Sequence, residues 1–120
     1  MSEGTPRPTV AYKVLTAEQM AVLEHDGSFA GAPVDLADGY IHLSTQTQLT
    51  ETVAKYFAGQ TGLWVATVDL DALGEAVKWE PSRGGQLFPH IYAPLPLSAV
   101  IAYGELARHQ DGSVQLPVAG

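Results

Sequence analysis

The sequence predicts an α+β fold: a single compact domain with a mainly antiparallel twisted sheet or sheets and two short helices in the N-terminal half. Helical patterns fill the first half of the chain and strand patterns the second, without the strand–helix alternation that a parallel sheet requires. The 120 residues, 46% of them hydrophobic, suit one hydrophobic core. We expect a flexible leader at residues 1–8 and one domain at residues 9–117.

The first predicted helix follows a strand. Alternation in VAYKVL, residues 10–15, predicts that strand. Thr16 and Gln19 then form a T-x-x-Q capping box, which is typical of a helix start, and Gly27 ends the helix.

A second strand-to-helix junction lies in DGYIHLST, residues 38–45. After a turn-rich link, YIHLS at residues 40–44 predicts a short strand. Thr45 and Gln48 repeat the capping box, and the helix that they start ends before Gly59.

The second half of the chain is rich in strand patterns. Pro89 cannot donate a ladder hydrogen bond, so its segment is predicted to be an edge strand or to contain a bulge. The predicted strands are LWVATVDL (63–70), AVKWE (76–80), LFPHIY (87–92), LSAVIAYGEL (97–106) and a weaker one in SVQLP (113–117).

The amino-acid composition limits the classes of partner that the protein can bind. Six Lys and Arg against 13 Asp and Glu give a formal charge of -7, which disfavours nucleic acid but still allows a small anionic molecule in a cleft. The absence of cysteine excludes disulfides and thiolate chemistry. No apolar run is long enough for a membrane span and the N-terminus lacks an apolar signal region, so we expect a cytoplasmic protein without a membrane partner. The sequence does not indicate its oligomeric state.

His42 is the first candidate for chemistry. The strand period of two places Tyr40, His42 and Ser44 on one face. His42 also precedes a helix N-terminus by a few residues, where free N–H groups favour an anion or a polarised carbonyl. The alternative is that His42 bonds a backbone group while Ser44 and Thr45 only cap the helix.

The segment WEPSRGGQLFPHIY, residues 79–92, carries a second group of candidates. The SRGG loop permits close backbone approach, so Arg83, beside Ser82, can clamp a carboxylate or phosphate. The alternative is a polar turn with an exposed arginine.

The strand after this loop places Phe88, His90 and Tyr92 on one face, a wall that suits a flat organic ligand or, alternatively, ordinary packing. Glu80 is either a general base or a partner of Lys78.

Two other chemistries are not supported by the spacing. His42, Glu80 and His90 show no metal-binding motif, so we predict no metal site. Ser44 and Ser82 lie in no G-x-S-x-G sequence, which argues against a serine hydrolase.

Together with YKVL near the start, DGYIHLST and WEPSRGGQLFPHIY resemble a mostly bacterial family known as domain of unknown function 952, over roughly residues 10–104. The resemblance implies membership of that family and transfers no established activity.

A GY-x-x-ST strand running into a helix with a later tyrosine, here Tyr40 to Tyr56, also looks like the middle motif of the ADP-ribosyltransferase fold. That remote likeness implies two small sheets around an NAD-binding cleft, with His42 near the usual aromatic position. This chain has Tyr12 and Lys13 where the fold usually has histidine or arginine, and Glu80 precedes a proline-broken loop. NAD is therefore a hypothetical cofactor.

We predict a small enzyme-like domain that binds a small anionic, nucleotide-like ligand and uses acid/base or group-transfer chemistry without a metal. The alternatives are a noncatalytic binding module and a structural hydrogen-bond network without a ligand. The candidate catalytic residues are His42, Glu80 and His90, and the candidate ligand-binding residues are Tyr12, Tyr40, Ser44, Thr45, Ser82, Arg83, Phe88 and Tyr92.

Overall fold

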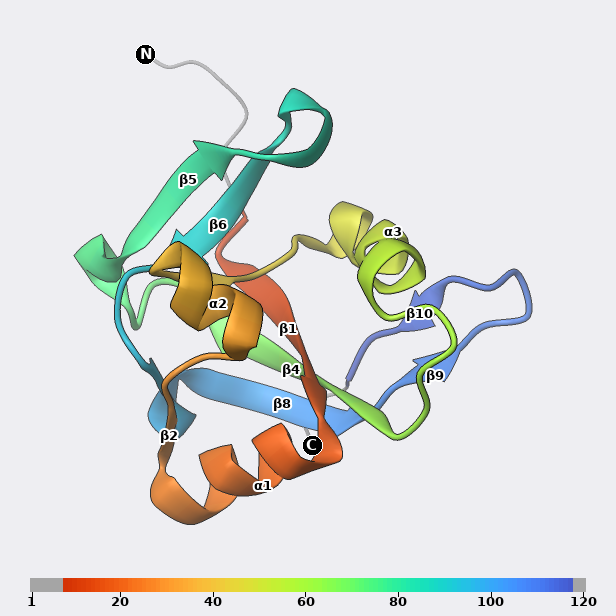
Figure 1. The fold of residues 1–120 in the computed structure, drawn as a ribbon, viewed down its shortest axis with the longest axis horizontal. Helices are drawn as coiled ribbons and strands as arrows, with labels where there is room; N and C mark the ends of the chain where they lie inside the picture. The colour runs from red at the N-terminus through yellow and green to blue at the C-terminus, as the bar shows by residue number, and fades with distance from the viewer. Residues whose placement is uncertain (1–7, 118–120) are drawn as a thin grey trace.

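The computed structural model describes residues 8–117, so residues 1–7 of the predicted leader lie outside the described residues. The described chain folds into one α+β domain with antiparallel sheets, as predicted (Figure 1). In chain order the helices and strands are β1 (Val10–Thr16), α1 (Ala17–Asp26), β2 (Ser28–Phe29), α2 (Pro33–Asp38), β3 (Ile41–His42), α3 (Gln46–Tyr56), β4 (Leu63–Asp69), β5 (Val77–Pro81), β6 (Leu87–Ile91), β7 (Leu95–Pro96), β8 (Val100–Glu105), β9 (Ala107–Arg108) and β10 (Val114–Gln115).

The first sheet has the strand order β1-β4-β8, and it is covered on both faces. Successive side chains of a strand point to opposite faces. Ala11 and Leu15 of β1 therefore face one core with α1, whereas Tyr12 and Val14 face a second core with α3. The helices contribute Met20 and Leu23 to the first core and Leu49 and Val53 to the second.

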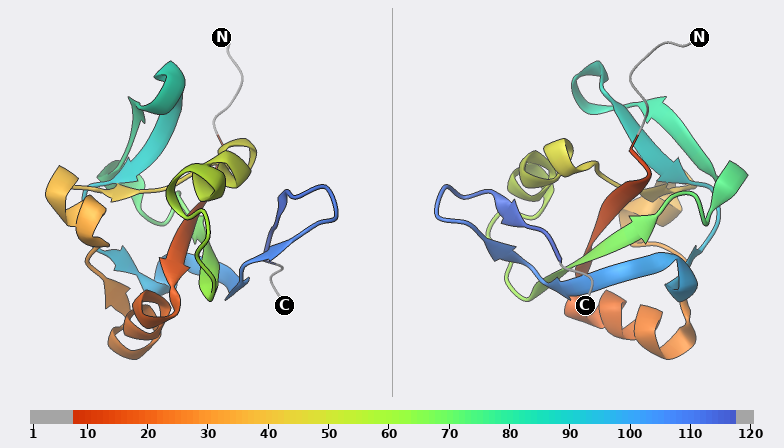
Figure 2. Two further views of the ribbon diagram at one scale, coloured as in Figure 1. Left: turned by 45° about the vertical axis from the view of Figure 1, so that its right-hand side comes forward. Right: turned by 180° about the vertical axis from the view of Figure 1, so that it is seen from behind.

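The second sheet has the order β3-β6-β5, and its β5–β6 hairpin projects beyond the first sheet (Figures 1 and 2). A bridge joins the sheets where β3 ends. The backbone N–H of Tyr12 donates to the carbonyl of Ser44 at 2.7 Å, and the N–H of Ser44 donates back at 2.9 Å. Because Tyr12 belongs to β1, this bridge sets the two sheets side by side and brings the second group of candidates close to the first.

Both predicted capping boxes are present at the helix starts. The backbone N–H of Thr16 donates to the Gln19 side chain and that of Gln19 to Thr16 Oγ1, at 3.0 and 3.1 Å. The N–H of Thr45 donates to the Gln48 side chain at 3.0 Å. Gly27 ends α1 with φ 78°, a left-handed conformation that favours glycine.

Two details of the prediction are wrong. The N-terminal half contains a third helix, α2, where a turn-rich link was expected; two of its apolar side chains, Val34 and Leu36, are exposed, so the sequence lacks an amphipathic helical period there. Pro89 lies in the central strand β6 rather than at an edge. Its carbonyl accepts a hydrogen bond from the N–H of Leu43. A continued ladder would also need an N–H at position 89, which proline lacks, but β3 already ends at His42.

Candidate functional site

The main cavity lies where the two sheets meet α2 and α3, and it has a volume of about 560 Å³. It opens to solvent beside Val34 of α2 and Tyr56 of α3, both of which are exposed. Its lining combines aromatic rings with polar groups from six of the elements around it: β1, α1, α2, β3, α3 and β6. The residues that line it are Tyr12, Lys13, Val14, Thr16, Gln19, Ala32, Pro33, Val34, Asp35, Asp38, Tyr40, His42, Ser44, Thr52, Tyr56, Phe57, Gln60, Ser82, Phe88 and His90.

A hydrogen-bonded pair of Glu80 and His90 forms part of this wall. His90 lines the cavity, and its Nδ1 lies 2.7 Å from Glu80 Oε1 on the neighbouring strand β5. The Tyr92 hydroxyl donates to both oxygens of the same carboxylate, at 2.9 and 3.1 Å. The hydrogen bonds from His90 and Tyr92 lower the pKa of Glu80, so the carboxylate stays ionised at neutral pH.

Tyr40 holds the imidazole of His90 from its face. The two rings are stacked, with centroids 4.1 Å apart and planes 22° from parallel. Tyr40 also packs against His42, with 4.8 Å between the centroids of the two rings. Burial and the charges of Asp38 and Glu80 raise the pKa of Tyr40, which keeps its hydroxyl protonated. His90 is therefore fixed by a carboxylate at one nitrogen and by an aromatic ring over its face.

A second polar cluster centres on Asp35 of α2, which is 1% exposed. Its Oδ2 accepts from Lys13 Nζ at 2.9 Å and from the N–H of Ala32 at 2.8 Å. Its Oδ1 accepts from His42, through the backbone N–H at 3.1 Å and through Nδ1 at 2.6 Å. Burial opposes ionisation of Asp35, but the hydrogen bond from His42 and the charge of Lys13 outweigh it and hold the pKa of Asp35 well below its ordinary value.

His42 is engaged at both ring nitrogens. Nδ1 contacts Asp35, and Nε2 lies 2.9 Å from Asp38 Oδ2. Only the doubly protonated imidazolium can donate to both carboxylates. Since Asp35 and Asp38 both belong to α2, this contact pair fastens α2 to the strand β3.

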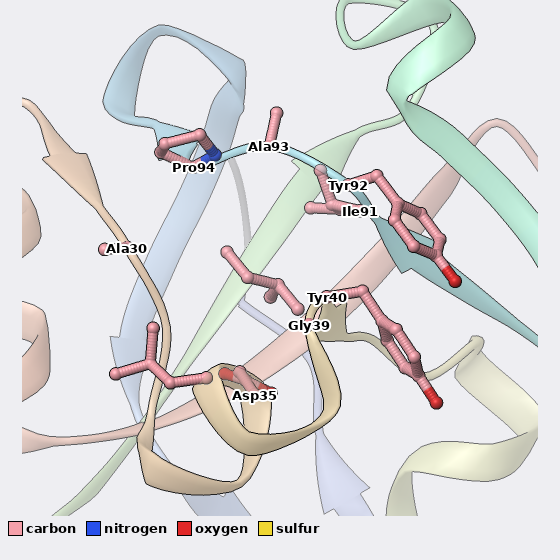
Figure 3. Close-up of a pocket in the computed structure, with 10 residues that line it drawn as sticks. Ala30, Asp35, Gly39, Tyr40, Ile91, Tyr92, Ala93 and Pro94 are labelled. Carbon is pink, nitrogen blue, oxygen red and sulfur yellow. The ribbon is translucent and has the colours of Figure 1, made fainter.

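A second cavity of about 250 Å³ lies beside Tyr40 (Figure 3). It is lined by residues of α2, of the end of β6 and of the β6–β7 connection, among them Leu36, Ile91 and Pro94. Tyr40 and Asp35 line both cavities. The rings of Tyr40 and Tyr92 lie side by side with centroids 5.2 Å apart, and their hydroxyls point the same way (Figure 3).

The structure brings most of the predicted site residues together. Seven of them line the main cavity: Tyr12, Tyr40, His42, Ser44, Ser82, Phe88 and His90. Three do not line it: Glu80 contacts His90, Tyr92 lines the second cavity, and Thr45 contacts Thr47. The Arg83 side chain lies outside the part of the chain that the structure describes.

Sequence reasoning missed the acidic partners of the histidines and the role of Lys13. Asp35 and Asp38 lie in a segment that was interpreted as a link, and no local pattern pairs Asp35 with Lys13 on a distant strand. Glu80 contacts His90 and Tyr92 in place of the proposed Lys78 partner.

Among the described residues no group of three or more histidine and acidic side chains is placed to hold a metal ion. None of the helices in residues 8–117 has the length and apolar character needed to cross a membrane.

The comparisons with known proteins concern the same segment. Residues 14–103 match the family model described as "Protein of unknown function (DUF952)". The chain belongs to this family. A comparison with curated proteins found no match.

Solved structures of one bacterial protein resemble the fold closely. The X-ray structure of protein CC0527 from Caulobacter crescentus is 46% identical, with a TM-score of 0.81 over 89% of this chain and 94% of that chain. Its solution NMR structure is 45% identical, with a TM-score of 0.75 over 89% and 91%. These findings confirm the predicted family; the remote likeness to ADP-ribosyltransferases is not shown by them and stays a hypothesis.

Proposed function

We propose that this protein is a small enzyme-like domain that binds a small, flat, anionic organic molecule in the main cavity and moves a proton through His90. The observation that carries the proposal is the 2.7 Å contact between His90 Nδ1 and Glu80 at the cavity wall. An ionised carboxylate can only accept a hydrogen bond, so Nδ1 carries a proton; in the neutral form of the ring the lone pair is then on Nε2, as a general base requires. Glu80 orients the ring and stabilises the imidazolium that forms when Nε2 takes a proton.

The lining supports a flat ligand. Its volume of about 560 Å³ lies in the range of small-molecule sites, and its aromatic side chains offer faces for a planar group. The aromatic residues are Tyr12, Tyr40, Tyr56, Phe57 and Phe88. NAD and other nucleotides are the first compounds to test because of the remote sequence likeness to ADP-ribosyltransferases.

Two cationic residues are the reason for proposing an anionic group on the ligand. Lys13 lines the cavity, although Asp35 already neutralises much of its charge. Ser82 also lines the cavity, and Arg83 follows it directly in the chain. A role for Arg83 in holding the anion remains a prediction from the sequence.

We assign His42 a positioning role in this proposal. Both of its ring nitrogens contact carboxylates of α2, so neither keeps a free lone pair for a ligand. His42 therefore holds α2 at the cavity wall, whereas His90 acts on the ligand. The noncatalytic binding module remains the alternative, because the same cavity can hold a ligand without proton transfer.

The experiment is a thermal-shift screen with NAD, nucleotides, sugar phosphates and small carboxylates, followed by mass spectrometry for product. His90→Gln is the test variant. His25→Gln is the matched control, because His25 is exposed and forms a similar contact with Asp26 at 2.9 Å outside the cavity. We expect one compound to stabilise the wild type and the control and to be converted by both, while His90→Gln yields no product. A compound that all three proteins bind and leave unchanged would support the binding module instead.

A further inference from the structure

Lys13 is a buried nucleophile that the proposed proton transfer does not use. The chain has three lysines; Lys55 and Lys78 are exposed, whereas the Lys13 side chain is 7% exposed and lines the main cavity. A lysine amine in a small-molecule cavity is the group that forms Schiff bases with carbonyl compounds.

We infer that Lys13 forms an imine with an aldehyde or ketone held in the main cavity. The Lys13 ammonium first releases one proton to solvent, and the Nζ lone pair then attacks the carbonyl carbon. A proton passes from nitrogen to oxygen to give a carbinolamine, whose hydroxyl takes up a proton and leaves as water when the C=N bond forms. One ammonium and one carbonyl compound thus give one protonated imine and one water, with no oxidant or reductant.

The position of Asp35 suits the product of this step. Its Oδ2 lies 2.9 Å from Lys13 Nζ, and the protonated imine keeps both the positive charge and one N–H at that nitrogen. The ion pair therefore survives the reaction. The two bonds that His42 donates to the other oxygen hold the carboxylate in place while the amine changes.

Burial of the Lys13 ammonium also eases the loss of the proton that the attack requires. Burial lowers the pKa of Lys13, and the opposing effect of Asp35 does not cancel it. The exposed ammonium groups of Lys55 and Lys78 have no comparable burial. His90 lines the same cavity and is the candidate for exchanging the protons of the carbinolamine.

The test is reductive trapping in the wild-type protein. The protein is mixed at neutral pH with glyoxylate, an anionic aldehyde, or with benzaldehyde, an uncharged flat one, reduced with borohydride and digested for peptide mass spectrometry. Lys55 and Lys78 are internal controls, and the same reaction in concentrated urea shows the reactivity of the three lysines without the fold. Lys13→Arg keeps a positive charge beside Asp35 and removes the nucleophile.

We expect at least one aldehyde to label Lys13 about tenfold or more faster than Lys55 and Lys78 in the folded protein, since the cavity holds the aldehyde beside the Lys13 amine. In urea the three lysines should react alike, and Lys13→Arg should lose the fast adduct. Labelling of Lys13 no faster than that of the exposed lysines, with both aldehydes, would overturn the inference. Peptide mapping of the wild type decides even if Lys13→Arg does not fold.

This inference goes beyond the proposed proton transfer and can fail separately from it. Fast trapping at Lys13 in a protein that converts no compound would retain the imine and reject the role of His90. Conversion that requires His90, without trapping at Lys13, would retain the proposed function alone.

Discussion

His90 and Glu80 form a hydrogen-bonded pair across the neighbouring strands β6 and β5, with 2.7 Å between Nδ1 and Oε1. In the ladder Glu80 faces Phe88, so His90 is its diagonal neighbour on the same face of the sheet. The pair explains how a histidine that is 2% exposed is accommodated in the interior, because its Nδ1 has a partner and its ring stacks on Tyr40. Tyr92 gives the same carboxylate a second donor.

Tyr92→Phe should raise the pKa of Glu80 toward its ordinary value. The change removes a hydroxyl that donates to both carboxylate oxygens, and hydrogen bonds to the charged form lower a carboxyl pKa. Carboxyl NMR titration measures the effect. Tyr103→Phe is the control, since that hydroxyl bonds to Glu24 and not to Glu80. Equal Glu80 pKa values in the wild type and Tyr92→Phe would refute the contact.

Asp35→Asn should destabilise the protein by about 3–5 kcal/mol, because it leaves the buried Lys13 ammonium without its counter-charge. Urea denaturation gives the free energy of unfolding. Asp26→Asn is the matched control: Asp26 is exposed and contacts the exposed His25, so its change should stay within about 0.5 kcal/mol. Equal effects of the two substitutions would contradict the central role of Asp35.

Asp35 should also make the free energy of unfolding depend on pH in the acidic range. The pKa of Asp35 is lower in the folded than in the unfolded protein, so its contribution is fully present above the unfolded value of about 4 and is lost as the pH falls below it. The free energy of unfolding should therefore decrease more steeply below about pH 4 in the wild type than in Asp35→Asn. Parallel curves for the two proteins would show that folding does not lower the pKa of Asp35.

Local signals account for what the sequence predicted well. The side chains of Thr16 and Thr45 lie near the helix ends that they mark, and the strand period correctly placed Tyr40, His42 and Ser44 on the cavity face. These features depend on residues a few positions apart. The helix α2 was missed because it has six residues and exposes apolar side chains, which removes the periodic signal.

The partners within the site depend on tertiary structure, and the sequence could not predict them. Both dense motifs contribute residues to the main cavity, but nothing local indicates that Asp35 bonds to Lys13 and His42, or that Glu80 bonds to His90. Pro89 was wrongly predicted to mark an edge strand or a bulge. That prediction rests on the missing N–H donor of proline, and β3 ends where this donor would be used.

Gln48→Ala should loosen the β5–β6 hairpin from α3. The buried Gln48 amide donates to the carbonyl of Leu87 at 2.8 Å, while its oxygen accepts from Thr45, so the change leaves two backbone groups without these partners and should cost about 1–3 kcal/mol. Amide exchange should increase most in residues 82–87. Gln46→Ala, at an exposed position of the same helix, is the control and should leave the exchange of the hairpin unchanged.

The most direct test of the central claim is a long-range ¹⁵N NMR measurement of the His90 ring in the wild-type protein at neutral pH, assigned with His90→Gln. The account predicts a proton on Nδ1, held by Glu80, and a lone pair on Nε2. In Glu80→Gln this preference should weaken. A ring with its proton on Nε2 in the wild type would contradict the account, because Nδ1 would then have no hydrogen to give Glu80 and Nε2 would have no lone pair with which to accept a proton from a ligand.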